Sequence, residues 1–272
     1  KHPIRSVINS ESKDVLGKWL QTGNTVLVIT SGIQYNISYK ILTGGICMGS
    51  YLNPGSKGFQ ESLNSEIYVD KSGLIEKTNA VINTRQKFIC VSRPRRFGKS
   101  MAADMLAAYY DRGEDTASLF DPLKISKTGS YQQHRNQYDV LKVNMQEFLS
   151  RSKEIGQVID RVRRMLLREL KNSYPDVDYF DDTDLVESLQ DIYAATKQSF
   201  VIIIDEWDVL IRDESANKKV QDEYIRFLRS MFKGTEPTKY MGLAYLTGIL
   251  PIKKLKTQSA LNNFDEFTML DA

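Results

Sequence analysis

The sequence predicts an α/β fold in which a parallel sheet carries helices on both faces. Three observations lead to this prediction. Apolar runs alternate with amphipathic helical patterns along the chain, one apolar run precedes Gly98-Lys99-Ser100, and another ends in Asp205-Glu206. Such alternation is typical of parallel strands joined by right-handed crossovers. With 272 residues, 41% of them hydrophobic, the chain is long enough to bury one sizeable core.

The first predicted elements surround the Gly-Lys-Ser segment. A lead-in strand or turn at 67–69 and a helix at about 74–84 come first. The apolar run at 88–92 predicts a buried strand. Residues 99–110 are expected to be helical because Ala, Met and Leu dominate there and neither Gly nor Pro interrupts them. A second core strand is expected at 138–144.

The second half of the chain continues the alternation. Apolar residues at helical spacing predict a helix over 153–171, and acidic residues supply a cap for another helix at about 184–197. The β-branched run at 200–205 is typical of a strand buried on both faces. A helix over 217–232 with one apolar face and a strand over 241–247 complete the core.

Gly98-Lys99-Ser100 is expected to form a phosphate-binding turn between a strand and a helix. Free backbone N–H groups and the positive end of the helix dipole hold anions at such a turn. Lys99 would then reach the β and γ phosphates, and the Ser100 hydroxyl would complete a Mg²⁺ shell. However, the common pattern G-x-x-x-x-G-K-[ST] has glycine where this chain has Arg93, and Pro94 favours extended dihedrals at Arg93. This segment alone leaves a nucleotide site and a chance Gly-Lys-Ser as equal alternatives.

Asp205 and Glu206 decide between these alternatives. They end a predicted strand and would lie in the crevice where open α/β sheets bind ligands. There Asp205 can bind Mg²⁺ beside Ser100, directly or through water, and Glu206 is placed to polarise an attacking water. Two acids at a strand end are by themselves most often solvated. Their order and spacing after the Gly-Lys-Ser turn favour the nucleotide site.

Thr247 ends the last predicted strand. In nucleotide hydrolases a polar residue at the end of the strand after the acid pair often senses the γ-phosphate, and Thr247 is the candidate for that role. A hydroxyl that satisfies the turn before Gly248 explains the residue equally well. Both interpretations stay open.

Five segments of the chain carry a family resemblance: 51–55, 67–75, 93–100, 202–208 and 246–251. From Met48 onward the chain resembles the bacterial AAA-ATPase-like proteins, whose ATPase module usually precedes a PD-(D/E)xK-type nuclease-like domain. In that family Arg-Arg-Phe-Gly-Lys-Ser, without the leading glycine, is the usual form of the phosphate loop. The departure at Arg93 is therefore expected.

The resemblance implies an ATP-binding module that hydrolyses ATP with Mg²⁺. Together with the residue patterns, it predicts that Glu206 and Thr247 serve catalysis and that Ser100 and Asp205 hold the metal. The predicted nucleotide-binding residues are Arg95, Arg96, Phe97, Gly98, Lys99, Ser100 and Met101. One of the two arginines would add charge at the γ-phosphate or instead face a partner. The resemblance also places Tyr68, Asp70 and Lys71 near the nucleotide base.

Residues 1–47 do not resemble the family. They contain one predicted strand at 25–30, end in a Gly-rich run, and do not begin with Met. We expect translation to start naturally at Met48, which would make 1–47 a non-native segment; a small added domain is the alternative. Residues 48–272 are expected to form the ATPase-like domain, truncated before the family's helical lid and nuclease-like region. Because an arginine finger or second sensor is normally carried there, hydrolysis by this chain is expected to be slow.

Composition narrows the function classes. A formal charge of +3 is too small to make the whole chain a nucleic-acid binder, although basic residues cluster at 85–99 and 151–171. The second cluster is a solvated helix face or a nucleic-acid or partner surface. Cys47 and Cys90 lack disulfide or zinc spacing, and His134, in a polar stretch, is expected to be exposed. No signal peptide is visible and the apolar runs are far shorter than the ~18 residues of a membrane span, so we expect a cytoplasmic protein without a membrane partner.

Three functions compete at this point. The leading one is a P-loop ATPase that uses ATP and Mg²⁺. The second is a switch that binds ATP, hydrolyses it negligibly and relays its occupancy to a C-terminal effector. The third is a nucleic-acid-binding module with a vestigial phosphate loop, whose affinity would fall steeply with salt. The sequence indicates neither the biological client nor the oligomeric state.

Overall fold

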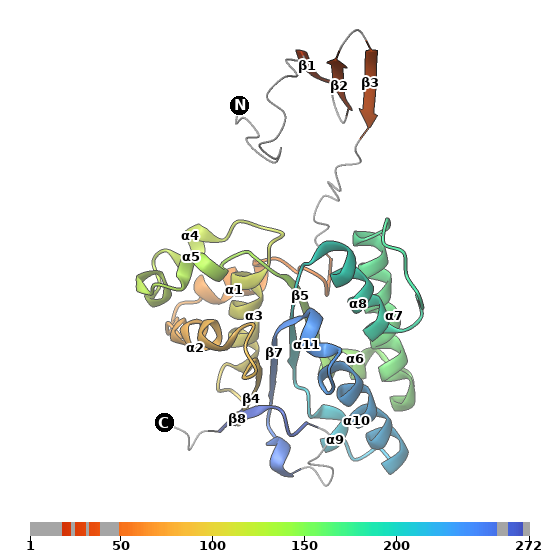
Figure 1. Cartoon of the computed structure of the whole chain (residues 1–272). Helices are drawn as coiled ribbons and strands as arrows, with labels where there is room; N and C mark the ends of the chain where they lie inside the picture. The colour runs from red at the N-terminus through yellow and green to blue at the C-terminus, as the bar shows by residue number, and fades with distance from the viewer. Residues whose placement is uncertain (1–17, 23–24, 31–32, 39–48, 255–260, 269–272) are drawn as a thin grey trace. The chain divides into compact units, whose positions relative to one another are not determined.

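The computed structural model of the chain is shown in Figure 1 and describes residues 18–22, 25–30, 33–38, 49–254 and 261–268. The chain divides into two compact units, Lys1–Gly44 and Gly45–Ala272. In the first unit, strands β1 (Lys18–Thr22), β2 (Thr25–Thr30) and β3 (Ile33–Ser38) form an antiparallel sheet. The strand predicted at 25–30 is therefore confirmed, and Met48, the expected start of translation, lies outside the described residues.

The second unit is built on a five-stranded parallel sheet, which confirms the predicted α/β class. Its strands are β4 (Phe88–Ser92), β5 (Asp139–Asn144), β6 (Phe200–Asp205), β7 (Met241–Gly248) and β8 (Asp265–Phe267), in the spatial order β5-β6-β7-β4-β8. The register pairs Asn144 with Asp205 and Asp205 with Thr247. The polar ends of three neighbouring strands thus meet at one edge of the sheet.

Helices cover both faces of this sheet (Figure 1). In chain order they are α1 (Lys57–Leu63), α2 (Gly73–Val81), α3 (Lys99–Tyr110), α4 (Ala117–Phe120), α5 (Tyr131–His134), α6 (Met145–Arg151), α7 (Val158–Ser173), α8 (Leu185–Thr196), α9 (Val209–Arg212), α10 (Lys218–Phe232) and α11 (Pro237–Tyr240), with 3₁₀ turns at Lys124–Lys127, Ile155–Gln157 and Ile252–Lys254. No helix among the described residues is both long and apolar enough to cross a bilayer.

Strand β6 shows why its sequence is apolar throughout. Ile202 and Ile204 pack into a core shared with α7, α8 and α10, whereas Val201 and Ile203 pack into a second core shared with α1, α2 and α3. Successive side chains of a strand point to opposite faces, so a strand between two helical layers needs apolar residues at every position. All six residues of β6 are buried, and its acidic end is thereby fixed in place.

Local capping fixes two helices next to the strands. The Asp184 side chain accepts from the backbone N–H groups of Val186 and Glu187 at 2.8 and 3.0 Å, which confirms the predicted cap of α8. The Asn144 side chain accepts from the N–H groups of Gln146 and Glu147 in the same way at the start of α6. An Asp or Asn at this position satisfies N–H groups that have no partner within the helix.

Four sequence predictions need correction. Of the strand or turn predicted at 67–69, the strand is wrong: residue 67 lies in a bend, and Ile67 and Val69 face solvent with 81% and 63% of their surface exposed. Helix α7 begins at Val158, after a 3₁₀ turn, and not at 153. Helix α2 ends at Val81, and Asn83 already has φ 60°. His134 is buried and not exposed, because its ring stacks on Tyr138 and its Nδ1 lies 2.9 Å from the Tyr138 hydroxyl.

Candidate nucleotide-binding site

The loop between β4 and α3 turns sharply at the predicted phosphate-binding segment. Gly98 has φ 72° and directly precedes α3, and a Cβ at Gly98 would lie 2.6 Å from Lys71 Nζ. Lys71, which lies outside this loop in sequence, donates from Nζ to the Phe97 carbonyl at 3.1 Å and so fixes the loop backbone. The Arg93 N–H donates to the Gly248 carbonyl at 3.0 Å, which extends the pairing of β4 with β7 by one residue. Arg93 is not among the residues with positive φ, so a glycine is not required there.

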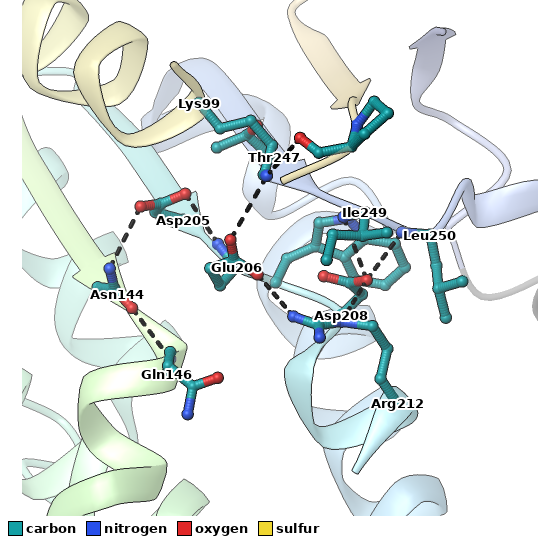
Figure 2. A network of polar contacts seen from close by, with 12 residues as sticks. Lys99, Asn144, Gln146, Asp205, Glu206, Asp208, Arg212, Thr247, Ile249 and Leu250 are labelled. Atoms are coloured by element: carbon teal, nitrogen blue, oxygen red, sulfur yellow. Dashed lines mark hydrogen bonds and ion pairs between the residues drawn. The ribbon is translucent and has the colours of Figure 1, made fainter. Parts of the chain in front are cut away.

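Lys99 lies at the first position of α3 with its side chain turned toward the strand ends. Only 7% of its surface is exposed. Its Nζ donates to the Pro94 carbonyl at 3.2 Å and lies 3.6 Å from Glu206 Oε1 (Figure 2). Loop and acid pair, more than a hundred residues apart in sequence, are thus in direct contact as the sequence predicted.

Asp205 is almost completely buried, with 1% of its surface exposed. Its Oδ2 accepts from Asn144 Nδ2 at 3.2 Å and its Oδ1 accepts from the Glu206 N–H at 3.0 Å. Burial raises the pKa of Asp205, and a hydrogen bond with the Ser100 side chain opposes that rise. A buried carboxylate beside a hydroxyl supplies hard oxygen ligands of the kind that Mg²⁺ prefers, whereas Asn144 turns its amide nitrogen to Asp205 and orients the carboxylate.

Glu206 is the first residue of a turn that holds several charged side chains in contact. Its φ of 51° lies in the left-handed region, which is costly for a residue other than glycine. Arg212 Nη2 donates to Glu206 Oε2 at 2.6 Å, and Arg212 Nε lies 2.8 Å from Asp208 Oδ2. Asp208, which is fully buried, accepts from the N–H groups of Ile249 and Leu250 at 3.2 and 2.8 Å (Figure 2).

An open pocket of about 620 Å³ lies at the carboxyl ends of the strands. It is lined by Arg95, Arg96, Gly98, Lys99, Ser100, Met101, Asn144, Gln146, Glu147, Ser150, Arg151, Glu206 and Arg212. Five lining residues are Arg or Lys and two are Glu, so the pocket favours an anion. Most of the nucleotide-binding residues predicted from the sequence contribute to it.

Comparison with known protein families gives a match over residues 55–257 to the family described as Predicted AAA-ATPase. The chain belongs to this AAA-ATPase-like family. The resemblance noted in the sequence is thereby confirmed. Membership of this family means that the chain contains a P-loop ATPase-like module. The nuclease-like domain implied by the resemblance stays a prediction.

The proteins similar to this AAA-ATPase-like chain include one curated relative and one solved structure. An uncharacterized protein in the vnfD 5' region of Azotobacter chroococcum mcd 1 is 24% identical over 215 residues, which make up 74% of this chain and 37% of that protein. This chain thus spans only 37% of the length of that curated relative. A solved structure, the Aeropyrum pernix ORC2 protein in ADPNP–ADP complexes, has a TM-score of 0.46 and 12% identity, over 79% of this chain and 51% of that chain.

Three predicted site residues of this AAA-ATPase-like chain do not line the pocket. Thr247 is fully buried and donates its hydroxyl to the Val91 carbonyl at 3.1 Å, across the β4–β7 pairing. Asp205 lies behind Ser100 and Asn144, and Phe97 exposes 49% of its surface. The γ-phosphate sensing predicted for Thr247 and the nucleotide contact predicted for Phe97 stay predictions.

The lead-in residues of the AAA-ATPase-like resemblance lie close to the loop. Lys71 contacts the Phe97 carbonyl as described above. Asp70 accepts from the N–H groups of Ser72 and Lys124 at 2.8 and 2.9 Å, so its carboxylate is used to join two segments of backbone. The Tyr68 ring packs edge-on against Phe59. Their placement near the nucleotide base stays a prediction.

The second basic stretch lies along α7 of this AAA-ATPase-like chain, away from the phosphate loop. It borders a pocket of about 880 Å³, whose lining includes Arg163, Arg164, Arg168 and Lys171. Two of these four cations already have acidic partners, since Arg163 lies 3.6 Å from Asp160 and Lys171 lies 2.7 Å from Asp182. The solvated face and the nucleic-acid or partner surface both stay predictions.

Sequence reasoning missed three residues of the site in this AAA-ATPase-like chain: Asn144, Asp208 and Arg212. Asn144 ends the strand beside β6, so its position at the end of a predicted strand was a usable signal. Asp208 and Arg212 lie four residues apart, a spacing that places an acid and a base on one face of a helix. The contact of Arg212 with Glu206 required the turn at 206–208, which the sequence did not predict.

Proposed function

We propose that the chain binds ATP with Mg²⁺ in the pocket beside Lys99 and hydrolyses it. The observation that carries this proposal is the contact of Lys99 with Glu206, which brings the phosphate loop and the acid pair to one pocket. The family assignment supports an ATPase-like module. The proposals that ATP is the nucleotide and that it is hydrolysed are argued from the chemistry of the residues in this pocket.

Phosphate binding is proposed for the start of α3. The first N–H groups of a helix have no partner within the helix, and they carry partial positive charge from the helix dipole. Lys99 adds a full charge there, and the exposed Arg95 and Arg96 add two more at the mouth of the pocket. A triphosphate would take Lys99 away from Glu206, because a phosphate oxygen carries more charge than one carboxylate oxygen and accepts charge-assisted hydrogen bonds.

The residues that would hold Mg²⁺ are Ser100 and Asp205. They fit the ion because burial raises the pKa of Asp205, so the ionised carboxylate gains from a cation beside it. Within residues 49–254 and 261–268 no cation forms an ion pair with Asp205, and Lys142, which is paired with Asp104, opposes the rise of its pKa only from a greater distance. When bound, Mg²⁺ neutralises phosphate charge and polarises the γ-phosphate.

Glu206 is proposed to orient the attacking water and to accept its proton. Its carboxylate lies in the pocket with 20% of the side chain exposed, and its Oε1 is freed for water once Lys99 turns to the phosphates. A carboxylate within hydrogen-bond reach of water serves as a general base in this way. The chain thereby separates phosphate binding, on Lys99, from water activation, on Glu206.

Phosphate release under single-turnover conditions tests the proposal. The parent should release phosphate from ATP and Mg²⁺, whereas Glu206→Gln should retain binding of a fluorescent ATP analogue and lose turnover. Lys171→Ala is the matched control because Lys171 is also paired with an acid but lies on α7, outside the pocket. Equal phosphate release by the parent and Glu206→Gln would contradict the role of Glu206.

A further inference from the structure

Four charged side chains form a continuous series of ion pairs that runs from the phosphate loop to the start of α9: Lys99, Glu206, Arg212 and Asp208. Lys99 Nζ lies 3.6 Å from Glu206 Oε1, and Arg212 Nη2 lies 2.6 Å from Glu206 Oε2. Arg212 Nε lies 2.8 Å from Asp208 Oδ2. Figure 2 shows Glu206 between the two cations and Arg212 between the two carboxylates. The proposed water-activating carboxylate is therefore held from both sides.

Asp208 is the fixed end of this series. It is completely buried, and Oδ2 accepts from two consecutive backbone N–H groups, those of Ile249 and Leu250. Gly248 packs directly on it, because a Cβ at Gly248 would lie 2.4 Å from Asp208 Oδ1. The position of the Asp208 carboxylate is therefore set by the backbone at 248–250, directly after β7.

Arg212 transmits that position to Glu206. Its side chain is 18% exposed and contacts two carboxylates that belong to the same turn of chain. Arg212 Nη2 donates a hydrogen bond to Glu206, whereas Nε makes no hydrogen bond among the described residues and its contact with Asp208 Oδ2 is an ion pair. Because the guanidinium group is planar and rigid, an ion pair that keeps its Nε edge beside Asp208 also restricts the direction in which Nη2 points. The left-handed backbone of Glu206 (φ 51°) persists only where its surroundings hold it, and Arg212 is one of those surroundings.

We propose that Arg212 is a positioning residue for the Glu206 carboxylate and that Asp208 couples it to the segment that follows β7. This inference rests on the proposed function of Glu206. In the nucleotide-free protein Lys99 and Arg212 share the carboxylate. Once the triphosphate takes Lys99, Arg212 is the cation that stays on Glu206 and keeps Oε1 directed toward the pocket.

The test separates positioning from simple stability. Arg212→Gln removes the charge, Arg212→Lys keeps it without the planar fork, and Arg112→Gln is the matched control. Arg112 also pairs with a fully buried carboxylate, Asp139, at 2.8 Å, but Asp139 starts β5 whereas the site lies at the end of that strand. Phosphate release in a single turnover and the dissociation constant of a fluorescent ATP analogue are measured for each variant.

We expect Arg212→Gln to slow the single-turnover step by on the order of 10- to 100-fold, since a misplaced catalytic group costs this much. Its analogue dissociation constant should stay within about threefold of the parent, because the contact is not made to the nucleotide. In a Glu206→Gln background, Arg212→Gln should cause no further loss. Arg212→Lys, the variant retained if Arg212→Gln does not fold, should show a smaller loss of the same kind.

Several results would overturn the proposal. Arg112→Gln slowing the reaction as much as Arg212→Gln would show a loss of stability only. An analogue affinity weakened tenfold at an unchanged rate would make Arg212 a nucleotide ligand. If the parent released no phosphate, the proposed hydrolysis would fail by itself, and nucleotide-free crystal structures would then decide on Arg212. A Glu206 carboxylate that kept its parental position in Arg212→Gln would contradict positioning, and a displaced carboxylate would support it.

Discussion

Replacement of Gly248 by alanine probes the link between β7 and the acid-rich turn. The added Cβ would lie 2.4 Å from Asp208 Oδ1, 2.8 Å from Trp207 Cδ1 and 2.9 Å from Trp207 Nε1. Optimal non-bonded separations are about 3.5–4.0 Å, so these atoms must move by about 1 Å. Asp208 and Trp207 are both fully buried and cannot swing into solvent. Overpacking of this kind costs about 1–3 kcal/mol.

The assay is thermal unfolding followed by circular dichroism. A cost of about 1–3 kcal/mol corresponds to a melting temperature lower by roughly 2–12 °C for a unit of this size. Gly73→Ala is the matched control, because Gly73 begins α2 and a Cβ there meets nothing within 4 Å. That control should melt at the parental temperature or slightly above it, since alanine favours a helix. A Gly248→Ala protein as stable as Gly73→Ala would refute the packing argument.

Three further outcomes are expected. Asp205→Asn should make binding of an ATP analogue depend less on Mg²⁺, and an unchanged Mg²⁺ dependence in a titration would exclude Asp205 from the metal site. Gly98→Ala should unfold more easily by about 1–2 kcal/mol, because alanine is strained at φ 72°, whereas the end of Lys71 can move aside. Burial lowers the pKa of His134 in the folded protein, so the unfolded chain takes up a proton first and stability falls as the pH drops below about 6.5. His134→Gln should flatten that decline between pH 7.5 and 5.5 in melting experiments, and an equal decline in both proteins would refute this assignment.

The strands and the long helices of the core were predictable because their patterns are local. Helix α3 has the bounds expected from its composition, and β6 has the bounds expected from its β-branched run. The acidic cap at Asp184 was likewise a local signal. The short strand β8 was not predicted, because three residues, Asp-Glu-Phe, carry no recognisable period and pair with β4 only through the tertiary fold.

The candidate site was predictable only in part, for a physical reason. Lys99, Ser100, Asp205 and Glu206 follow elements that the sequence predicts, so their meeting at one edge of the sheet could be expected. The partners of these residues could not. Arg212 reaches Glu206 only because the chain turns through a left-handed residue after β6, and such a turn has no sequence signature without glycine. His134 was misjudged because the polar residues around it gave no sign that its ring would stack on Tyr138, four residues further along the chain.

The central claim is that Lys99 binds the phosphates of ATP, and equilibrium binding of a fluorescent ATP analogue with Mg²⁺ tests it most directly. Loss of a charge-assisted hydrogen bond costs about 1.5–3 kcal/mol, which corresponds to roughly a tenfold or greater weakening. Lys99→Ala should therefore bind the analogue at least that much more weakly than the parent, while Lys171→Ala binds like the parent. A Lys99→Ala protein that folds and binds the analogue as tightly as the parent would contradict the account.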